Sequence, residues 1–534
     1  MERLPVLWQL DRYHIIRDIL YPSNSGSGAL YREWLGYLLE AGYGVAIVDA
    51  RGAGASFGSA QGPFAAAEIR DAYDITEWLA GHPWSTGRIG MIGRSYSGIV
   101  QYLAAASRPP HLCAAFAEMA LGDLYGFVYS GGIFRHDFAL NWQKRVRDLD
   151  CLADAIAVDE DGDRSCVQAA QAEHRRNRDV YDMFFSLPYR DSVDSSDGSS
   201  PYQERSPLAY RDSISASAIP ICHYSGWMDL WVRDAILWFP RLHNAQALTI
   251  GPWSHGGGIN ANLAAAQDEW FGPWLKEARP SSLTGTIRYL PLSGHAGETW
   301  RTLQDWPPSD TCYRKLHLRT GPSGTVASCN DGCLDLERES NWGADRLAVN
   351  YESTTGRASR WSTGYGAEFR YPDLTRHAQT CLTYTSDPCR DNADIVGHPQ
   401  VHLWISTVAP DVDIFVYLEQ VYPDGTSEYL TEGCLRLSHR AVTDSPLEAL
   451  SLPFHPSTAA SLSANTESPV ELWFDLHPVA LRIVKGRRLR LCIAGADRDN
   501  ALTPRLSHSA MFQLHRGNIH PSSVTLPFRG QAWI

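Results

Sequence analysis

A serine flanked by small residues stands between a predicted strand and a predicted helix. The segment Gly93-Arg94-Ser95-Tyr96-Ser97-Gly98 separates the apolar run 89–92 from an apolar segment, rich in helix formers, that begins at Ile99. A serine at such a sharp turn presents its hydroxyl, and the amide of the next residue faces the same space. This serine can attack a carbonyl carbon once a base removes its proton.

An acid and a base follow two later apolar runs. Asp229 comes after the predicted strand 219–224, and His255 comes after the predicted strand 247–250. The chain order serine, aspartate, histidine is that of the α/β-hydrolase triad. In such a triad the histidine takes the serine proton and the aspartate holds the imidazole in the productive tautomer.

Each of the three residues also has a plain structural interpretation. Ser95 fits an ordinary tight turn, Asp229 fits the N-cap of the following helix, and His255 fits an exposed loop. The last glycine of the consensus G-x-S-x-G comes one residue late, with Ser97 in its place. The order of the three residues therefore supports the hypothesis more than any single motif does.

The elements that would position these residues alternate between strand and helix. This alternation predicts an α/β domain with a parallel sheet covered by helices on both faces, whose strands end at the same edge. The predicted strands are 5–8, 45–48, 89–92, 111–116, 219–224 and 247–250, and the predicted helices are 31–41, 65–80, the segment from 99, and 231–242.

Two further regions differ from this pattern. Residues 122–215 are rich in charge and aromatics, which predicts an insertion with helices at 142–149 and 165–178 and a disordered serine-rich tract at 191–200. Alternating apolar residues after about 306 predict a β-sandwich. The expected division is 1–121 and 216–285 for the α/β domain, 122–215 for a helical cap, 286–305 for a linker and 306–534 for a jelly roll.

Charge and local motifs argue against several partners and cofactors. The net charge of −13 disfavours nucleic acid and anionic membranes, which select basic surfaces. The glycine-rich loop 49–56 has the spacing of neither a P-loop nor a dinucleotide fingerprint. We therefore expect no cofactor, no nucleic acid and no membrane as partners.

The eleven cysteines are scattered along the chain. Only Cys329 and Cys333 lie close together, and no second pair or nearby histidine completes a zinc pattern, so no metal is predicted. Mostly free, buried thiols are typical of a reducing compartment. The amino-terminal residues do not resemble a signal peptide, and no window reaches the length of a membrane span, so we expect a cytoplasmic protein.

Several motifs in order resemble one family, the serine hydrolases of the cocaine esterase and X-Pro dipeptidyl-peptidase type (CocE/NonD). They read VAIVDARGAGAS, DITEWLAGHPWSTGRIGMIGRSYSG, SGWMDLW, GPWSH and GRRLRLCIAGAD. The elbow of this family, G-x-S-Y-x-G, accommodates the late Gly98. The resemblance implies an α/β-hydrolase domain, a helical cap and a carboxyl-terminal jelly roll, with Ser95 as nucleophile, Asp229 as acid and His255 as base.

The resemblance also implies an oxyanion hole. Its donors would be the amide of Tyr96 and the hydroxyl of Tyr13, although the family's tyrosine usually stands in a Pro-Tyr pair and here follows Arg12. Tyr21 is the alternative. Members of the family normally carry one or two strands before this point, so we expect that the sequence starts late.

The expected function is hydrolysis of a small ester or amide through an acyl-enzyme. An X-Pro dipeptidyl peptidase and an acyltransferase or cyclase of a biosynthetic pathway stay open as alternatives, and a non-enzymatic binding protein has less support. Trp227 and Trp253 are candidates for substrate binding, with core packing as the alternative, and Trp231 is expected nearby. The partner is a small-molecule ester or amide, and a homodimer stays open.

Overall fold

The structure is a computed structural model that describes residues 3–21, 27–152, 155–259, 261–276, 281–292, 298–367, 369–443, 450–464, 467–504 and 510–530. The chain divides into two compact units. The first comprises Met1–Leu124, Ala139–Leu187 and Val193–Arg288, and the second comprises Tyr125–Phe138, Pro188–Ser192 and Tyr289–Ile534.

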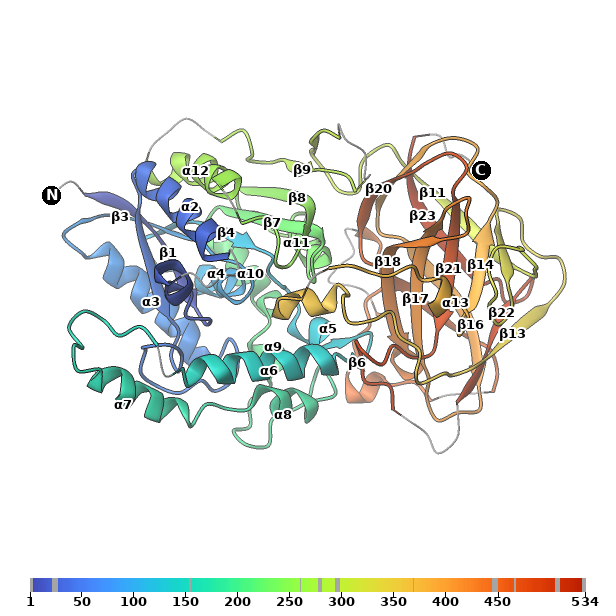
Figure 1. Cartoon of the computed structure of the whole chain (residues 1–534), viewed down its shortest axis with the longest axis horizontal. Coiled ribbons are helices and arrows are strands. Elements are labelled where there is room, and N and C mark those ends of the chain that lie inside the picture. Colours follow the sequence, from blue (N-terminus) through green and yellow to red (C-terminus); the bar gives the residue numbers. More distant parts are fainter. Residues whose placement is uncertain are drawn as a thin grey trace. The chain divides into compact units, whose positions relative to one another are not determined.

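A parallel sheet forms the centre of the first unit, as the sequence predicts (Figure 1). Its strands lie in the order β8-β7-β4-β3-β1-β2, and every neighbouring pair is parallel. Seven of the eight residues of β1 are buried, because the sheet is covered on both faces. The strands are β1 (Leu4–Asp11), β2 (Gly44–Asp49), β3 (Ser85–Met91), β4 (Leu112–Glu118), β7 (Ile221–Met228) and β8 (Gln246–Ser254).

Helices cover the two faces of this sheet (Figure 1). On one face, Trp34 of α2 (Ser27–Glu40) and Phe271 of α12 (Ala261–Leu275) pack in a hydrophobic cluster with Leu7 of β1. Four other helices contact the strands or one another and contribute no residue to that cluster. They are α3 (Ala66–Ala80), α4 (Tyr96–Ser107), α10 (Arg211–Ser217) and α11 (Val232–Trp238). The predicted α/β class is therefore confirmed.

The helix predicted at 231–242 is shorter in the structure. Pro240 has no backbone N–H to donate to the Ile236 carbonyl, so it interrupts the hydrogen bonds of the helix. The helix α11 therefore ends at Trp238.

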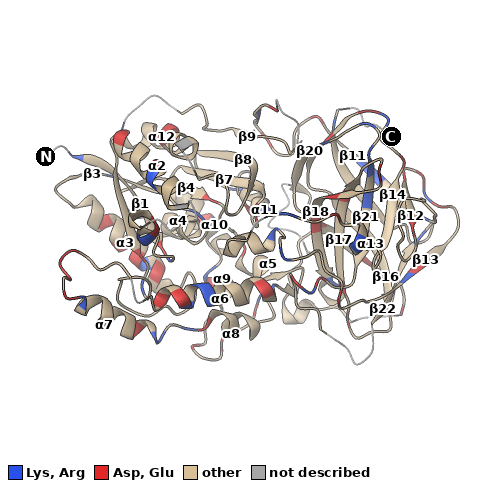
Figure 2. Cartoon of the chain, viewed as in Figure 1, with Lys and Arg blue, Asp and Glu red and all other residues tan. Residues whose placement is uncertain are grey.

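The inserted region contains both helices that its periodicity predicts. They are α6 (His136–Asp150), along which acidic and basic residues are interspersed (Figure 2), and α7 (Ser165–His174), which ends four residues before the predicted end at 178. The remaining short elements of this part of the chain are α1 (Ile16–Leu20), α5 (Leu124–Val128), β5 (Tyr129–Ser130), β6 (Ile133–Phe134), α8 (Val180–Phe185), α9 (Pro201–Glu204) and η1 (Pro207–Tyr210).

The prediction of disorder for the serine-rich tract was wrong. Residues 194–200 form turns in which Asp194 accepts hydrogen bonds from the amide and the hydroxyl of Ser196, at 2.9 and 2.7 Å. The carboxylate of Asp194 also pairs with Arg178. Serine and aspartate side chains that bond to nearby backbone order such a loop without a regular element.

The second unit is rich in β-structure, as predicted for the carboxyl-terminal half. Its large sheet runs β13-β22-β16-β23-β11-β12-β14-β21-β17-β18, with β15 paired to β20 and β23, and β19 paired to β16. A core of buried aliphatic and aromatic side chains holds it together. The strands are β11 (Thr311–Arg319), β12 (Gly332–Asp335), β13 (Gly343–Ala348), β14 (Leu382–Ser386), β15 (Ala393–Gly397), β16 (Gln400–Thr407), β17 (Asp413–Val421), β18 (Ser427–Arg436), β19 (Val470–Asp475), β20 (Val479–Ile483), β21 (Arg488–Ala494), β22 (Met511–Arg516) and β23 (Ser523–Arg529).

Between the two large groups of strands, the chain forms β9 (Ile287–Tyr289) and β10 (Arg301–Leu303). The second unit also has α13 (Thr375–Ala378) and the short 3-10 helices η2 (Trp361–Tyr365), η3 (Leu437–His439) and η5 (Ala459–Ser461).

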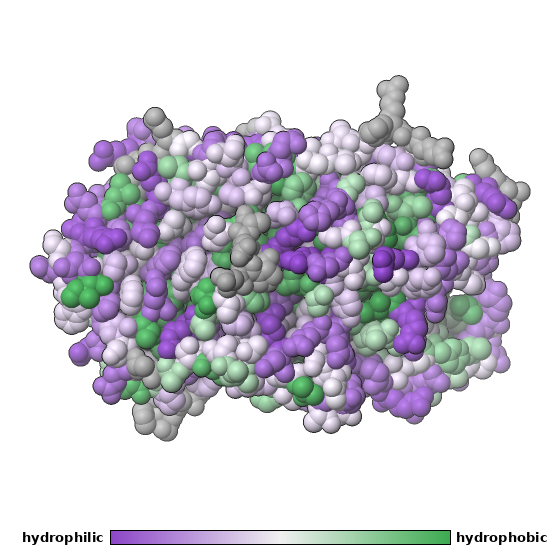
Figure 3. Space-filling model, turned by 180° about the vertical axis from the view of Figure 1, so that it is seen from behind, coloured by the Kyte–Doolittle hydropathy of each residue, from purple (hydrophilic) through white to green (hydrophobic). Residues whose placement is uncertain are grey.

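Hydrophobic residues on the displayed face are scattered in small groups among hydrophilic ones (Figure 3). Within the described ranges, no helix combines the length and the apolar character that crossing a bilayer requires.

Candidate active site

Ser95 lies at a strained turn between β3 and α4. Its backbone has φ 58° and ψ −122°, a region that residues other than glycine rarely adopt. The turn is held against the end of β4, because the Ser95 amide donates to the Glu118 carbonyl at 3.0 Å and the Glu118 amide donates to the Gly93 carbonyl at 3.1 Å. This backbone has the strain that a nucleophile elbow requires.

Two glycines explain the unusual spacing of the elbow motif. A Cβ on Gly93, whose φ is +131°, would lie 2.5 Å from Cβ of Ser97. A Cβ on Gly98 would lie 2.6 Å from the Glu118 carbonyl oxygen. The close approach of α4 to β4 therefore requires glycine at 98. Ser97 is accommodated in the place of the consensus glycine, where its hydroxyl donates to the Leu10 carbonyl at 2.6 Å.

Asp229 and His255 directly follow the adjacent parallel strands β7 and β8, and their side chains meet. Nδ1 of His255 lies 2.6 Å from Oδ1 of Asp229, and it is the donor because a carboxylate only accepts. The other carboxylate oxygen, Oδ2, accepts from the Ser225 hydroxyl at 3.1 Å and from the Trp231 amide at 3.0 Å. Asp229 is completely buried, so these donors replace water around its charge.

The structure does not support the interpretation of Asp229 as a helix N-cap or of His255 as an exposed loop residue. The N-cap of α11 is Trp231 and not Asp229. His255 is only 6% exposed, so it does not decorate the surface. The Trp231 ring packs edge-on against the imidazole, with ring centres 4.9 Å apart.

The tyrosines considered for the oxyanion hole lie in different surroundings. Tyr96 is the first residue of α4, so its amide has no acceptor within the helix. Tyr13 lies edge-on to the Tyr96 ring at 6.5 Å, and its hydroxyl accepts a hydrogen bond from Nε1 of Trp142 at 3.1 Å. Tyr21 is 68% exposed. The structure thus brings Tyr13, and not Tyr21, beside the elbow.

The buried carboxyl of Glu68 accepts hydrogen bonds next to the turn that holds Ser95. The Tyr96 hydroxyl donates to Oε2 of Glu68 at 2.7 Å, and the Phe64 amide donates to the same oxygen at 3.0 Å. Burial raises the pKa of Glu68 to about 7, although hydrogen bonding from Tyr96 and the nearby Arg12 act in the opposite direction.

Arg12, which precedes Tyr13, has a function in packing that the sequence did not reveal. Its guanidinium forms a buried, two-pronged ion pair with Asp150 at the end of α6, and Asn177 donates to Oδ2 of Asp150 at 2.7 Å. A cavity of about 310 Å³ lies here, and among its lining residues are Arg12, Tyr96, Trp142 and Asp150. The segment after β1 is therefore tied to the inserted helix, because neither charge is stable when buried alone.

The two predicted substrate-binding tryptophans differ in exposure. Trp227 is completely buried, so its ring has no surface open to a ligand. Trp253 is partly exposed and stacks on Tyr224 with ring centres 4.9 Å apart.

All eleven cysteines are free, as predicted, but only four of them are buried. The prediction of mostly buried thiols was wrong, since three are exposed and four are partly exposed.

Comparison with known sequences identifies both halves of the chain. Residues 1–257 match the X-Pro dipeptidyl-peptidase (S15 family), and residues 282–525 match the X-Pro dipeptidyl-peptidase C-terminal non-catalytic domain. A candidate serine esterase of Mycobacterium tuberculosis is 29% identical, over 98% of this chain and 90% of its own length. Cocaine esterase of Rhodococcus is 25% identical, over 92% of this chain and 89% of its own length.

A solved structure shares the fold over the whole chain. It is a CocE/NonD family hydrolase from Staphylococcus aureus, with a TM-score of 0.72 and 18% identity, and the match covers 99% of this chain and 89% of that one. The order of the domains, the fold and the sequence matches agree, and this chain is a serine hydrolase of the CocE/NonD family.

Proposed function

We propose that this hydrolase cleaves a small-molecule ester or amide through an acyl-enzyme formed on Ser95. The observation that carries the proposal is the buried contact of 2.6 Å between Asp229 and His255, on loops that follow neighbouring parallel strands. The strained backbone of Ser95, at the end of another strand of the same sheet, supports it further.

In the first half of the reaction, Ser95 attacks the substrate carbonyl. Because Nδ1 of His255 is bonded to Asp229, the other ring nitrogen, Nε2, accepts the proton of the Ser95 hydroxyl. The bond from Oγ to the carbonyl carbon forms as the proton moves. Asp229 then stabilises the imidazolium, and the same proton goes to the leaving alcohol or amine as its bond to the carbon breaks.

The negative charge that develops on the substrate oxygen needs donors. We assign this function to the amide of Tyr96 and the hydroxyl of Tyr13. The hydrogen bond from Trp142 uses the Tyr13 oxygen as an acceptor, which leaves the phenolic proton available for the substrate. Each such donor contributes about 3 kcal/mol to stabilisation of the transition state.

In the second half, water attacks the acyl-enzyme. His255 takes a proton from that water, the tetrahedral intermediate collapses, and the proton returns to Ser95 as the free acid leaves. An alcohol or amine that replaced the water would turn the same steps into acyl transfer.

Turnover of two chromogenic substrates tests the proposal. We expect hydrolysis of a p-nitrophenyl ester of a small acid by the wild-type protein and its loss in Ser95→Ala, with little turnover of Ala-Pro-p-nitroanilide. Preferred cleavage of the anilide would favour the X-Pro dipeptidyl peptidase, and esterase activity that persists in Ser95→Ala would contradict the proposal. Mass spectrometry of the products with an added alcohol or amine separates hydrolysis from acyl transfer.

A further inference from the structure

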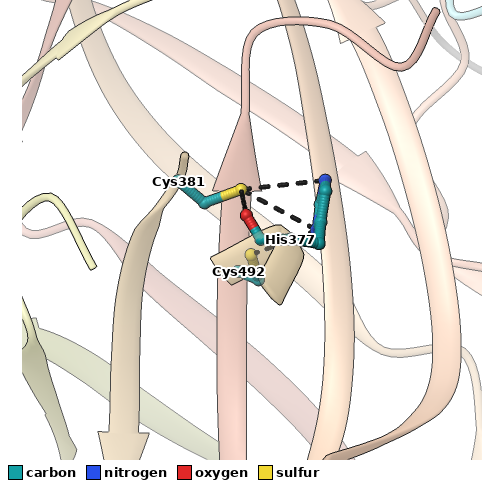
Figure 4. Close-up of side chains that lie close together, drawn as sticks. All are labelled: His377, Cys381 and Cys492. Carbon is teal, nitrogen blue, oxygen red and sulfur yellow. Dashed lines mark hydrogen bonds between the residues drawn. The ribbon is translucent and has the colours of Figure 1, made fainter. Parts of the chain in front are cut away.

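A second group of reactive side chains is buried in the β-rich unit. His377, Cys381 and Cys492 lie together there (Figure 4). His377 is on α13, Cys381 comes one residue before β14, and Cys492 is on β21. The proposed hydrolysis does not use these residues.

Strand pairing explains why the two thiols meet. Thr383 of β14 is opposite Cys492 of β21 in an antiparallel pair, and Cys381 precedes Thr383 by two residues. Because side chains alternate along a strand, Cys381, Thr383 and Cys492 face the same side. The neighbours Leu382 and Leu491 belong to the hydrophobic core, so the thiols point away from that core.

The imidazole of His377 lies beside the two thiols. His377 lies four residues before Cys381, and the turn that joins them is held by the Thr380 amide, which donates to the His377 carbonyl at 3.0 Å. Its ring also packs edge-on against Tyr417 of β17, with ring centres 5.1 Å apart. The short helix α13 thus lies over β21 and β17.

The distances from the imidazole to the two sulfurs match those of a metal site. Nδ1 of His377 is 3.8 Å from Sγ of Cys381 and 3.8 Å from Sγ of Cys492, and the three donor atoms all lie within 4.8 Å of one another. An ion bonded to sulfur at about 2.3 Å and to nitrogen at about 2.0 Å, at an angle of about 110–120°, holds those two donors roughly 3.5–3.8 Å apart.

The imidazole must also turn to bind an ion. Sγ of Cys381 is 3.8 Å from both ring nitrogens, so it is aligned with neither of them. Ligation requires the imidazole to turn about its Cβ–Cγ bond until one nitrogen faces the two sulfurs.

Burial makes the three groups poorly solvated without an ion. The exposed fractions of Cys381, Cys492 and His377 are 0%, 0% and 7%. In the part of the chain that the structure describes, the ring nitrogens of His377 have hydrogen-bond contacts only to sulfur, at 3.8 Å, which is long for a strong bond. The Cys381 thiol donates to the His377 carbonyl at 3.3 Å, a bond that ligation of the thiolate would replace. A metal ion would satisfy the imidazole, which the protein leaves weakly paired.

The charges favour a divalent ion. Two thiolates and a neutral imidazole around a dication form a neutral set, whereas a monovalent ion would leave a buried negative charge. Thiolate and imidazole ligands select zinc among the common divalent ions. Binding releases the two thiol protons to solvent.

We propose that His377, Cys381 and Cys492 form a binding site for a thiophilic divalent cation such as Zn²⁺. Because the ligands are buried, the ion would not meet a substrate. Its effect is structural: it fastens α13 to the face of β21 and links two strands of the sheet.

Titration of the metal-free full-length protein with Co²⁺ tests this site. Thiolate-bound cobalt has a charge-transfer band in the near ultraviolet, and we expect that band to saturate at one ion per chain. Cys381→Ala, Cys492→Ala and His377→Gln should weaken binding at least tenfold. Cys389→Ala, which alters another buried cysteine of the same unit, should leave binding unchanged.

The wild-type titration alone can overturn the proposal, even if a variant fails to fold. The absence of a charge-transfer band in the wild-type protein would overturn it. A band that persists in Cys381→Ala and Cys492→Ala would also do so, because it would come from the exposed thiols Cys151, Cys166 and Cys329. As a second measurement, Zn²⁺ should raise the melting temperature of the wild-type protein and not that of Cys492→Ala.

Discussion

Each of the two units buries a histidine beside a proposed functional partner, which is Asp229 for His255 and Cys492 for His377. The chain brings these two pairs together in different ways. In the first unit, Asp229 and His255 each directly follow a parallel strand, and parallel strands end at one edge. In the second unit, His377 and Cys492 are 115 residues apart, and only the register of antiparallel strands brings them together. Loops at one sheet edge can be recognised from the sequence, whereas a cross-strand pair requires the register.

The largest expected effect is the loss of kcat when Asp229, the acid of the proposed triad, is replaced. Asp229→Asn should lower kcat by about 10⁴-fold, because an amide in place of the carboxylate favours the wrong imidazole tautomer. Steady-state kinetics with the p-nitrophenyl ester measures this. Asp234→Asn, which alters a partly buried aspartate close in sequence, is the control and should keep kcat within a few-fold. Equal losses in both variants would show that loss of a carboxylate in this part of the chain, and not loss of the contact with His255, lowers kcat.

The tyrosines near the elbow offer a smaller effect. Tyr13→Phe should lower kcat by about 100-fold with little change in KM, since one oxyanion donor is lost and the ring remains. Tyr21→Phe is the control, because Tyr21 is 68% exposed, and should behave like the wild-type protein. A lower kcat in Tyr21→Phe, with a wild-type kcat in Tyr13→Phe, would identify Tyr21 as the oxyanion donor instead.

The buried carboxyl behind the elbow predicts a dependence of stability on pH. The folded protein holds a proton on Glu68 up to about pH 7, whereas the unfolded chain loses it near the ordinary pKa of 4.5. The free energy of unfolding should therefore fall as the pH rises from about 4.5 to 7, by up to about 3 kcal/mol, and Glu68→Gln should remove this slope.

Asp394 of the second unit is the matched control for this slope. Pairing with Arg482 and Arg301 outweighs burial and lowers its pKa below 3.8. It is ionised in both states across the same window, so Asp394→Asn should lower stability by a constant amount there. Urea denaturation at a series of pH values measures both, and an unchanged slope in Glu68→Gln would contradict the assignment to Glu68.

The smallest expected effect compares two helical glycines of the first unit. Gly98→Ala should lower the free energy of unfolding by about 1–3 kcal/mol, because its Cβ would lie 2.6 Å from a backbone oxygen. Gly36→Ala, where a Cβ meets nothing within 4 Å, should raise it by about 0.5–1 kcal/mol. Chemical denaturation measures both changes, and the same sign in both variants would contradict the close approach of α4 to β4.

The sequence predicted those features of this fold that have local signals. The parallel strands appeared as short apolar runs, and Ser95, Asp229 and His255 each follow such a run, which is why the sheet and the Asp229–His255 pair were foreseen. The helix α11 is shorter than the predicted 231–242, because Pro240 interrupts its hydrogen bonds.

Features that depend on tertiary contacts could not be predicted in this way. Nothing near Arg12 in the sequence indicates its pairing with Asp150, which lies 138 residues away. The spacing of His377 and Cys381, four residues apart, was a weak signal for a metal site, but the third ligand depends on which strand pairs with β14.

Trapping of the nucleophile tests the central claim most directly. After reaction with a fluorophosphonate, mass spectrometry should find one adduct per chain, on the peptide that contains Ser95, and none in Ser95→Ala. An adduct on another serine, or an equal yield in Ser95→Ala, would contradict the assignment of Ser95 as the nucleophile.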